Sequence, residues 1–362
     1  MMGIPSPEEL KDILHNYNLR DLAIATLASH SALQLLKGAK DEGLRTVLIV
    51  EKDRLELYEE FSHLVDRFVI VERFKDIDKV IDILVKENCI FIPHGSAVEY
   101  VGPEKFLSLR IPIFGNRNLM VWEGNQHLKM KLLREAGIDV PEEYSIDSDF
   151  QDLVIVKLSG AKGGKHFFIA KSSAEVKKRL EDYLNRGIIK TLDEVLIQKY
   201  IIGVPMYFHY FYSPLFERVE ILGIDIRYET NIDGLKRLPI DIEKLGIEPT
   251  FIVVGNLPVV IREKMLQKVL DYGKKFVKKT QELMPPGVIG PFCLESIVVD
   301  DNTIKVFEFS GRIVAGTNIY IGFGSPYAWL YWNEPMYMGR RIAREIRLAA
   351  ERGVQYLLRV VT

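Results

Sequence analysis

Residues 289–318 read IGPFCLESIVVDDNTIKVFEFSGRIVAGTN and are the best starting point for reading the fold of this chain. Apolar and β-branched residues dominate 292–299, and 304–309 is apolar again. Between them, Asp300, Asp301 and Asn302 supply turn chemistry. The stretch therefore predicts two short strands joined by a turn, that is, a β-hairpin.

Each predicted strand carries one carboxylate, Glu295 or Glu308, within an apolar run. An unpaired buried carboxylate is costly, so each must meet a cation, a donor or water. Mg²⁺ would satisfy both, because it is usually held by one or two carboxylates together with substrate phosphates. Ser310 and Arg312 share the face of Glu308 on an extended strand and could add an oxygen ligand and a phosphate clamp. On these residues alone, strand-end glutamates that face solvent or pair with Arg312 are an equal alternative.

Composition and charge narrow the class of protein. The chain has 362 residues, 48% of them hydrophobic and 27% charged, and a formal net charge of −2. This is ordinary for a soluble globular protein and gives no basic footprint for nucleic acid. No apolar run is long enough to span a membrane, and residues 1–14 lack a targeting pattern, so we expect a cytoplasmic protein. Cys89 and Cys293 lie in apolar runs and are interpreted as small core residues rather than metal ligands or a disulfide.

The first third of the chain alternates strand and helix patterns. This alternation predicts a doubly wound parallel sheet, which binds ligands at the carboxyl ends of its strands. The predicted strands are 22–27, 46–50, 68–71 and 89–93, and a final strand and a turn are predicted at 111–118. Two helices are predicted between the strands, one from the pattern of Leu33, Leu36 and Ala39 and one at 77–85.

Polar residues follow two of these strands. Ser29, His30 and Ser31 come after the first strand, and His94 and Ser96 follow the strand at 89–93. Free N–H groups and the dipole of a helix N-terminus favour an anion there, so the two turns could converge on one phosphate. The alternative is that Ser29 or Ser31 only caps its helix and that His94 is a hydrogen-bonded histidine on the surface.

A glycine-rich loop lies between two further predicted strands, at 153–157 and 166–170. The first strand ends in Lys157, and the loop LSGAKGGK contains Gly163 and Gly164. Glycine lets backbone N–H groups approach phosphate oxygens and lysine supplies charge, although such a loop is more often just a turn. A later apolar strand, 195–202, could be the hinge on which an adenine ring lies, read by the backbone of Lys199 and Ile201.

The remaining patterns predict structural elements without a functional signal. Strands are predicted at 206–212 and 219–228 and helices at 264–283 and 339–352. The aromatic residues of 207–212 are interpreted as sheet core. The charged residues of 339–352 are expected to form a solvated face.

The order of these features resembles the ATP-grasp superfamily. A strand-end lysine, a glycine-rich hairpin, a hinge closed by glycine and two glutamates followed by Ser-x-Arg recur there in this order. The resemblance implies a mixed α/β and α+β fold, in which a doubly wound pre-ATP-grasp domain precedes a two-lobed ATP-grasp module. The predicted divisions are 1–118 for the nucleotide-fold domain with the substrate phosphate site, 119–203 for the lobe with the glycine-rich loop, and 204–362 for the lobe with the metal-binding carboxylates.

A closer resemblance spans nearly the whole chain. Separated blocks are similar to the archaeal formate-dependent FAICAR synthetase family, PurP, whose members use ATP and formate to formylate the purine precursor AICAR. The blocks are ASHSALQ (28–34), PHGS (93–96), FGNR (114–117), HYFYSP (209–214), RYETNIDG (227–234), GNLPVVIRE (255–263), GPFCLES (290–296) and AGTN (315–318).

The resemblance implies roles for individual residues. His30, Ser31, His94, Ser96 and Asn256 would bind AICAR; Lys157, Gly163, Gly164, Gln198, Lys199, Ile201 and Glu229 would surround ATP; Glu295 and Glu308 would hold Mg²⁺ or Mn²⁺. Arg312 and Lys157 would neutralise charge during catalysis, and His30 would position AICAR rather than relay a proton. The chain departs from the family at Gln198 and Lys199, where acidic residues are expected in the hinge, and at Gly311, which replaces alanine.

The implied mechanism needs no protein nucleophile, because formate would attack the γ-phosphorus and AICAR would attack the resulting formyl phosphate. Small molecules (formate, AICAR and ATP) are the expected partners, together with further copies of the same chain. Two alternatives stay open: an ATP-grasp ligase with another carboxylate or amine, and a nucleotide-binding paralogue without catalysis.

Overall fold

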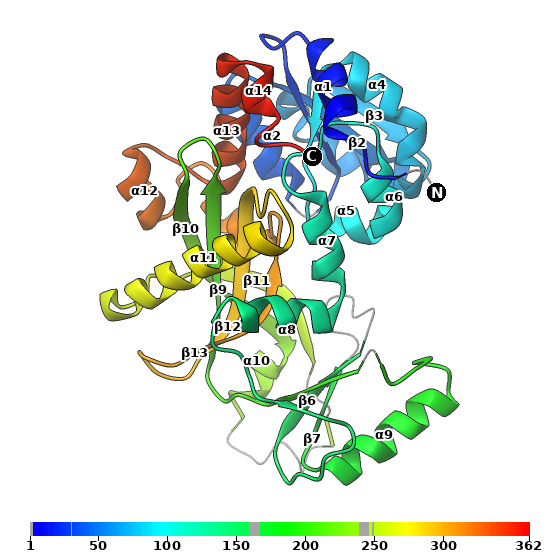
Figure 1. Ribbon diagram of the computed structural model, residues 1–362, viewed down its shortest axis with the longest axis vertical. Helices are drawn as coiled ribbons and strands as arrows, with labels where there is room; N and C mark the ends of the chain where they lie inside the picture. Colours follow the sequence, from blue (N-terminus) through cyan, green and yellow to red (C-terminus); the bar gives the residue numbers. More distant parts are fainter. Residues whose placement is uncertain (1–2, 30, 159–166, 194, 239–245, 248–249) are drawn as a thin grey trace.

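The structure, a computed structural model, describes residues 3–29, 31–158, 167–193, 195–238, 246–247 and 250–362. Three sheets follow one another along the long axis of the molecule (Figure 1). Within the described residues, no helix has both the length and the apolar character that crossing a bilayer requires.

The first sheet is parallel and four-stranded, in the order β3-β2-β1-β4. Its strands are β1 (Ala23–Leu27), β2 (Arg45–Glu51), β3 (Arg67–Val71) and β4 (Cys89–Phe91). The helical segments around it are α1 (Pro7–His15), α2 (Ala32–Asp41), η1 (Lys52–Arg54), α3 (Leu55–Glu59), η2 (Ser62–Leu64), η3 (Phe74–Val80), α4 (Ile81–Lys86), α5 (Gly95–Val101) and α6 (Pro103–Ser108). The predicted doubly wound sheet is confirmed.

Two details of this region differ from the sequence patterns. The helix expected at 77–85 is divided into η3 and α4. The strand expected in the first part of 111–118 is reduced to two isolated bridges, Phe91 with Ile113 and Phe114 with Val361, and helix α7 (Arg117–Gly124) begins three residues later.

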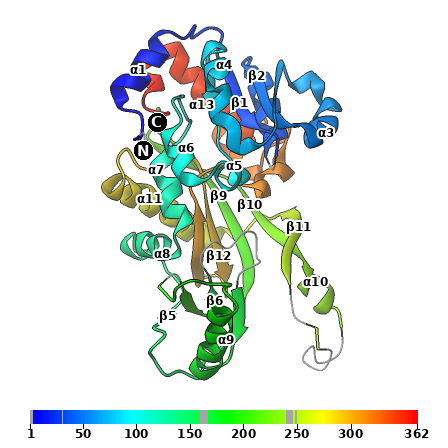
Figure 2. The ribbon, with the colours of Figure 1, turned by 90° about the vertical axis from the view of Figure 1, so that its right-hand side faces the viewer.

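The second sheet is antiparallel, in the order β5-β8-β6-β7. Its strands are β5 (Glu143–Tyr144), β6 (Val154–Lys157), β7 (Phe167–Ala170) and β8 (Leu196–Lys199), and α9 (Ser173–Asn185) packs against β7. Helix α8 (Gln126–Glu135), which precedes β5 in the chain, packs instead against the third sheet. Figure 2 shows this lobe at the opposite end of the molecule from β1 to β4.

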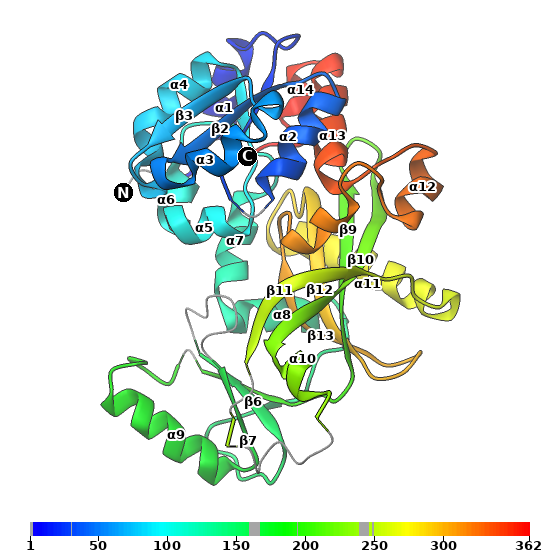
Figure 3. The same ribbon diagram turned by 180° about the vertical axis from the view of Figure 1, so that it is seen from behind.

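The third sheet lies between the other two and is also antiparallel, in the order β11-β10-β9-β12-β13 (Figure 3). Its strands are β9 (Val204–Ser213), β10 (Arg218–Asn231), β11 (Phe251–Pro258), β12 (Gly290–Val298) and β13 (Ile304–Ser310). The helical segments of this part are α10 (Ile232–Leu235), α11 (Glu263–Leu283), η5 (Ala315–Tyr320), α12 (Pro326–Trp332), α13 (Met338–Arg352) and α14 (Val354–Leu357).

The core of this sheet contains the aromatic residues that the sequence placed there. Phe208, Tyr210 and Phe211 are completely buried, and Tyr210 stacks on Phe292 with ring centroids 4.8 Å apart. Cys293 is buried in the same sheet, and Cys89 is buried in β4. These interpretations are confirmed.

The chain returns from the third sheet to the first. Helix α13 crosses α2 so closely that a Cβ at Gly38 would overlap the backbone of Gly339. Beyond α13, the backbone of Thr362 exchanges two hydrogen bonds with Ile113, of 2.8 and 3.0 Å. The C-terminal helices are therefore part of the packing around the first sheet.

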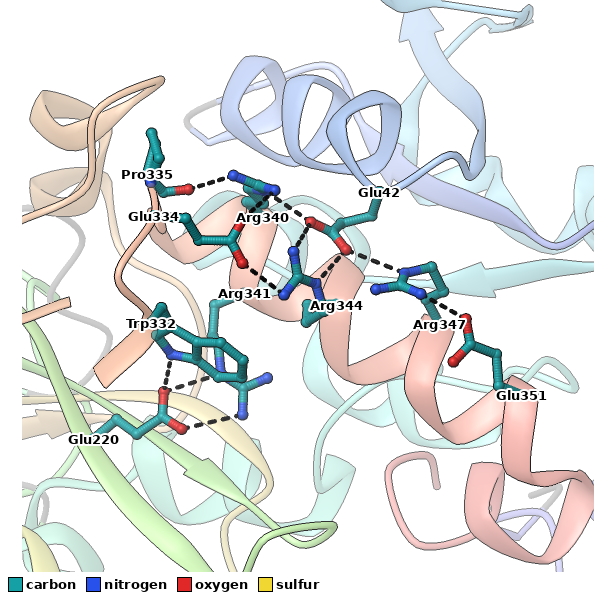
Figure 4. Close-up of polar contacts among 10 residues, drawn as sticks. All are labelled: Glu42, Glu220, Trp332, Glu334, Pro335, Arg340, Arg341, Arg344, Arg347 and Glu351. Atoms are coloured by element: carbon teal, nitrogen blue, oxygen red, sulfur yellow. Dashed lines mark hydrogen bonds and ion pairs between the residues drawn. The ribbon is translucent and has the colours of Figure 1, made fainter. Parts of the chain in front are cut away.

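The expectation that the charged residues of α13 form a solvated face is wrong. Arg341 and Glu345 are fully buried, and Arg341 donates to Glu220 of β10, with Nε 3.0 Å from Oε2. On the other side of the helix, Arg340, Arg344 and Arg347 all contact Glu42, just after α2 (Figure 4). Buried charges must be paired, and the partners come from distant parts of the chain.

Replacing Glu42 with Gln should lower the free energy of unfolding by about 2–4 kcal/mol at neutral pH, because three partly buried arginines lose the buried carboxylate that pairs with them. Burial acts to raise the pKa of Glu42, but hydrogen bonds from Arg344 and Arg340 outweigh it and lower the pKa below 4.5. The stabilisation is therefore complete above pH 4.5 and is lost as pH falls through the folded-state value.

Urea unfolding of both proteins at neutral and at acidic pH measures this effect. Glu351→Gln is the matched control, because Glu351 binds Arg347 of the same helix but its side chain is 54% exposed. We expect the control to change stability by less than about 0.5 kcal/mol. An equal loss for Glu42→Gln at both pH values would contradict the role of its charge.

Candidate active site

Glu295 of β12 and Glu308 of β13 lie directly opposite each other across the hairpin. The register of the two strands shifts between Glu295 and Ser296, and such irregularities often re-aim side chains next to functional sites. Ser310 donates to Glu295, with Oγ 3.2 Å from Oε1, so it is held beside the carboxylates as the strand pattern predicted. The sequence thus brings two carboxylates and a hydroxyl to one place.

Neither glutamate pairs with Arg312, and each has another cation. Arg227 of β10 places Nη1 3.3 Å from Oε2 of Glu295. Lys129 of α8, which is almost fully buried, places Nζ 2.5 Å from Oε1 of Glu308. Burial acts to raise the pKa of Glu308, but the charges of Lys129 and Lys157 outweigh it and lower the pKa, so Glu308 is ionised at neutral pH.

Lys157, at the end of β6, connects the lobe of the second sheet to this pair. Its Nζ donates to the carbonyl oxygen of Phe307 at 3.1 Å and lies 4.9 Å from the centroid of the Phe307 ring. Burial lowers the pKa of Lys157 to about 8, against the opposing effect of Glu308. The lysine is therefore buried next to the carboxylate pair, and its ammonium group is held by the strand that carries Glu308.

The predicted hinge begins with the last two residues of β8, Gln198 and Lys199. Gln198 is completely buried, and within the described residues neither atom of its side-chain amide has a hydrogen-bond partner. Lys199 is engaged elsewhere: its N–H donates to the carbonyl of Glu142 at 2.8 Å, and its Nζ lies 3.5 Å from Asp152. Ile201 is partly exposed just beyond the strand.

Glu229 of β10 lies near this hinge. Burial and then the charge of Glu229 raise the pKa of Tyr200, which places the carboxylate within electrostatic reach of the hinge. Burial also raises the pKa of Glu229 itself, while Arg227 acts in the opposite direction. Charge interactions therefore link the predicted hinge, Glu229, Arg227 and the carboxylate pair of Glu295 and Glu308.

The turns after β1 and β4 converge, as predicted. The Oγ of Ser29 donates to the Oγ of Ser96 at 3.1 Å, and Ser31 is buried beside them at the start of α2. Arg54 and Tyr100, which the sequence did not single out, complete this edge: Nη2 of Arg54 is 3.2 Å from the Tyr100 hydroxyl.

The alternative in which His94 is only a surface histidine is wrong, because its ring is completely buried and Nε2 lies 3.0 Å from the carbonyl oxygen of Leu27. Burial lowers the pKa of His94 to about 4, so the ring is neutral at physiological pH.

Arg312 faces this same edge of the first sheet. Its Nη2 is 2.6 Å from Oε1 of Glu123 in α7, and a Cβ at residue 95 would lie 3.0 Å from Nη1. The other carboxylate oxygen of Glu123 accepts from the N–H of Gly311 at 2.9 Å. Arg312 therefore connects the end of β13 to the turn that holds His94 and Ser96.

Asn256 of β11 has a fixed orientation. Its Nδ2 donates to Oδ2 of Asp225 at 2.6 Å, and Oδ1 of Asp225 is 2.6 Å from Nε2 of the buried His209. Because a carboxylate can only accept, Nδ2 is the atom of Asn256 that it binds, and Oδ1 is left to accept from another group. Burial acts to raise the pKa of Asp225, but the hydrogen bond with His209 and the charges of His209 and Arg227 outweigh it, so this carboxyl is ionised.

Three predicted site residues, His30, Gly163 and Gly164, lie outside the described residues, with the rest of the loop 160–165. Besides Arg54 and Tyr100, the residues that the sequence analysis missed are Arg227, Lys129, Glu123 and Asp225. One signal could have drawn attention to the first and last of these: Asp225, Arg227 and Glu229 alternate along a single predicted strand.

Comparison with known proteins places this geometry in a family. Two family models match the chain: a domain of unknown function, DUF1297, over residues 175–362, and a protein of unknown function, DUF1246, over residues 24–144. The 5-formaminoimidazole-4-carboxamide-1-(beta)-D-ribofuranosyl 5'-monophosphate synthetase of Ignicoccus hospitalis is 55% identical over 344 residues, which make up 94% of this chain and 97% of the relative. The chain belongs to this synthetase family.

Solved structures agree with membership of the synthetase family. The IMP biosynthesis protein PurP from Thermococcus kodakaraensis is 35% identical with a TM-score of 0.73, and the match covers 94% of this chain and all of that one. An ADP complex of purK, the N5-carboxyaminoimidazole ribonucleotide synthetase, is 13% identical with a TM-score of 0.58 over 88% of this chain and 74% of its own, and shows a shared fold. The predicted PurP family and fold class are confirmed.

Proposed function

We propose that this chain uses ATP and formate to formylate AICAR, giving FAICAR, ADP and phosphate in purine biosynthesis. One observation carries the proposal within the family: Glu295 and Glu308 face each other, and Lys157 from the other lobe bonds to the strand beside them. This is the arrangement expected of a site that neutralises a triphosphate between two lobes.

Adenine is proposed to lie on the hinge at 198–201. The buried amide of Gln198 supports this, because a buried amide without partners is costly and a bound base or water would satisfy it. Since the N–H of Lys199 is already used by Glu142, its carbonyl is the atom offered to the base. Glu229 is proposed to bind the ribose, and Lys157, with Gly163 and Gly164, to bind the phosphates.

The carboxylate pair fits Mg²⁺ or Mn²⁺. Its oxygen ligands suit hard cations, and within the described residues no cluster of three or more His, Cys, Asp or Glu side chains provides an all-protein cage. Glu295 and Glu308 would hold the ion together with phosphate oxygens and water, and the ion would offset negative charge on the phosphates. Arg227 pairs with Glu295 and Lys129 pairs with Glu308, so each of the two carboxylates has a counter-charge from another element.

Catalysis then consists mainly of positioning and charge neutralisation. A formate oxygen attacks the γ-phosphorus of ATP, the bond to the bridging oxygen breaks, and ADP leaves with its electron pair. The 5-amino nitrogen of AICAR attacks the formyl carbon of the resulting formyl phosphate; phosphate leaves and the amine loses a proton. Lys157 holds positive charge next to the transferred group, and Arg312 is proposed to do the same from the side of the first sheet.

AICAR is proposed to bind between the first sheet and β11. Ser31 and Ser96, with His30, would hold the phosphate of AICAR. Neutral, buried His94 would hold the turns in place through its contact with the carbonyl oxygen of Leu27. Because Nδ2 of Asn256 donates to Asp225, its Oδ1 would accept from an N–H group of the base.

One assay tests the function. ADP release should require both formate and AICAR, and the product should be FAICAR by mass spectrometry. ATP hydrolysis that ignores formate, or turnover only with another carboxylate or amine, would overturn the proposal; tight nucleotide binding without any turnover would favour the non-catalytic alternative.

The homo-oligomeric state and cytoplasmic location expected from the sequence stay predictions. Exposed apolar side chains near α12 support self-association: Phe323 is 76% and Leu330 is 82% exposed.

A further inference from the structure

Arg227 pairs with Glu295 at the centre of the candidate site, and none of the substrates has yet been assigned to it. Its guanidinium carbon is 3.5 Å from the centroid of the Tyr207 ring on the neighbouring strand β9. Tyr207 is almost fully buried, at 4% exposure, so the plane on which the guanidinium rests is fixed by the core. The guanidinium is thus held flat in one orientation, with part of its side chain still exposed.

The neighbours of Arg227 belong to all three proposed subsites. Asn256, the proposed AICAR contact, is its cross-strand partner on β11. Glu295, of the metal pair, is 3.3 Å away, and the charge of Arg227 also acts on Glu229, proposed for the ribose. A group between the metal pair and the acceptor amine occupies the place where the one-carbon substrate must be activated and then transferred.

The other cations of the site are already engaged. Lys129 pairs with Glu308, Lys157 bonds to the strand at Phe307, and Arg312 pairs with Glu123 on the side of the first sheet. Within the described part of the chain, the single ionic contact of Arg227 is made by Nη1, and no hydrogen bond from its other nitrogens to a side chain or backbone is found. Its fork of N–H donors is therefore available to an anion.

We propose that Arg227 binds the carboxylate of formate, next to the γ-phosphate of ATP. This inference rests on the proposed function and adds to it the residue that selects the one-carbon substrate. A planar guanidinium matches a carboxylate with two parallel N–H···O bonds, whereas an ammonium acts as a point charge. Formate carries only a hydrogen atom on its carboxylate, so its two oxygens are the groups that the protein can bind specifically.

Replacing Arg227 with Lys keeps the charge and removes the fork. Because a hydrogen bond to a charged group contributes about 1.5–3 kcal/mol, we expect the KM for formate to rise by about 10- to 150-fold. The KM values for ATP and AICAR should stay within about threefold, and high formate should restore turnover. Initial rates of ADP release at varied formate, with ATP and AICAR saturating, measure this, and calorimetric titration with ADP checks that the nucleotide site is intact.

Arg218→Lys is the matched control. Arg218 lies on the same strand, rests 5.3 Å from the Tyr331 ring centroid and pairs with a glutamate, Glu220, at 2.7 Å, but at the other end of β10. The KM of the Arg218→Lys variant for formate should equal that of the unmodified chain.

The outcomes separate the two proposals. A raised KM for ATP with an unchanged KM for formate would assign Arg227 to the triphosphate and overturn the formate site, as would unchanged values for all three substrates. If the unmodified chain releases no ADP in response to formate, the proposed function fails, and the formate site fails with it.

Discussion

Glu308→Gln is expected to lower kcat for formate-dependent ADP release by about 10³-fold or more, because charge stabilisation of the transferred phosphoryl group is the largest contribution to such a reaction. Glutamine keeps the shape of the side chain and one acceptor oxygen but lacks the negative charge that a divalent cation requires. Glu295 alone would then face the cation, across the hairpin from a neutral amide.

The measurement is a single-turnover assay with MnATP, formate and AICAR, together with a titration of Mn²⁺ binding in the presence of ATP. Lys129 loses its partner in this variant, so thermal unfolding must show that the fold survives. Glu308→Asp, which keeps the charge on a shorter side chain, should recover part of the activity. Glu181→Gln, on the exposed face of α9, is the control and should be fully active. Normal turnover by Glu308→Gln would remove the metal pair from the mechanism.

Gly339→Ala is expected to destabilise the protein by about 3 kcal/mol or more, or to prevent soluble expression, because overpacking between backbones cannot be relieved by a rotamer change. A Cβ at residue 339 would overlap the carbonyl group of Gln34, and the facing Gly38 meets α13 in the same way. Both contacts are with main chain, so one helix would have to move away from the other.

Thermal unfolding by circular dichroism measures this effect. Gly124→Ala is the control, because Gly124 is also helical but has nothing within 4 Å of the added methyl group. Gly124→Ala should leave the free energy of unfolding unchanged or raise it by about 0.5–1 kcal/mol. A melting temperature for Gly339→Ala equal to that of Gly124→Ala would show that the two helices can separate without cost.

Much of the fold could be predicted because its signals are local. The β12–β13 hairpin follows from two apolar runs around Asp300, Asp301 and Asn302, and its pairing places Glu295 opposite Glu308. The parallel sheet follows from alternating strand and helix patterns. In both cases the residues that decide the structure lie within a few positions of one another.

The cations of the site could not be predicted in the same way. Lys129 meets Glu308 across 179 residues of sequence, and Arg227 reaches Glu295 only because β9 lies between β10 and β12. No local pattern distinguishes a buried lysine of an amphipathic helix from a solvated one. The error at α13 has the same origin, since the partner of Arg341 is Glu220, 121 positions away.

The contact between α2 and α13 also sets a condition on how this protein is made. Glu42 and its partner Arg344 are 302 residues apart, so at ordinary translation rates α2 leaves the ribosome about 15–60 s before its partner helix exists. During that interval Leu35 and Ala39, which later pack in one cluster with Ile342 and Ile346, have no permanent cover. The first module to be synthesised is thus completed late in synthesis, and nascent chains that stop before α13 would be natural clients for chaperones.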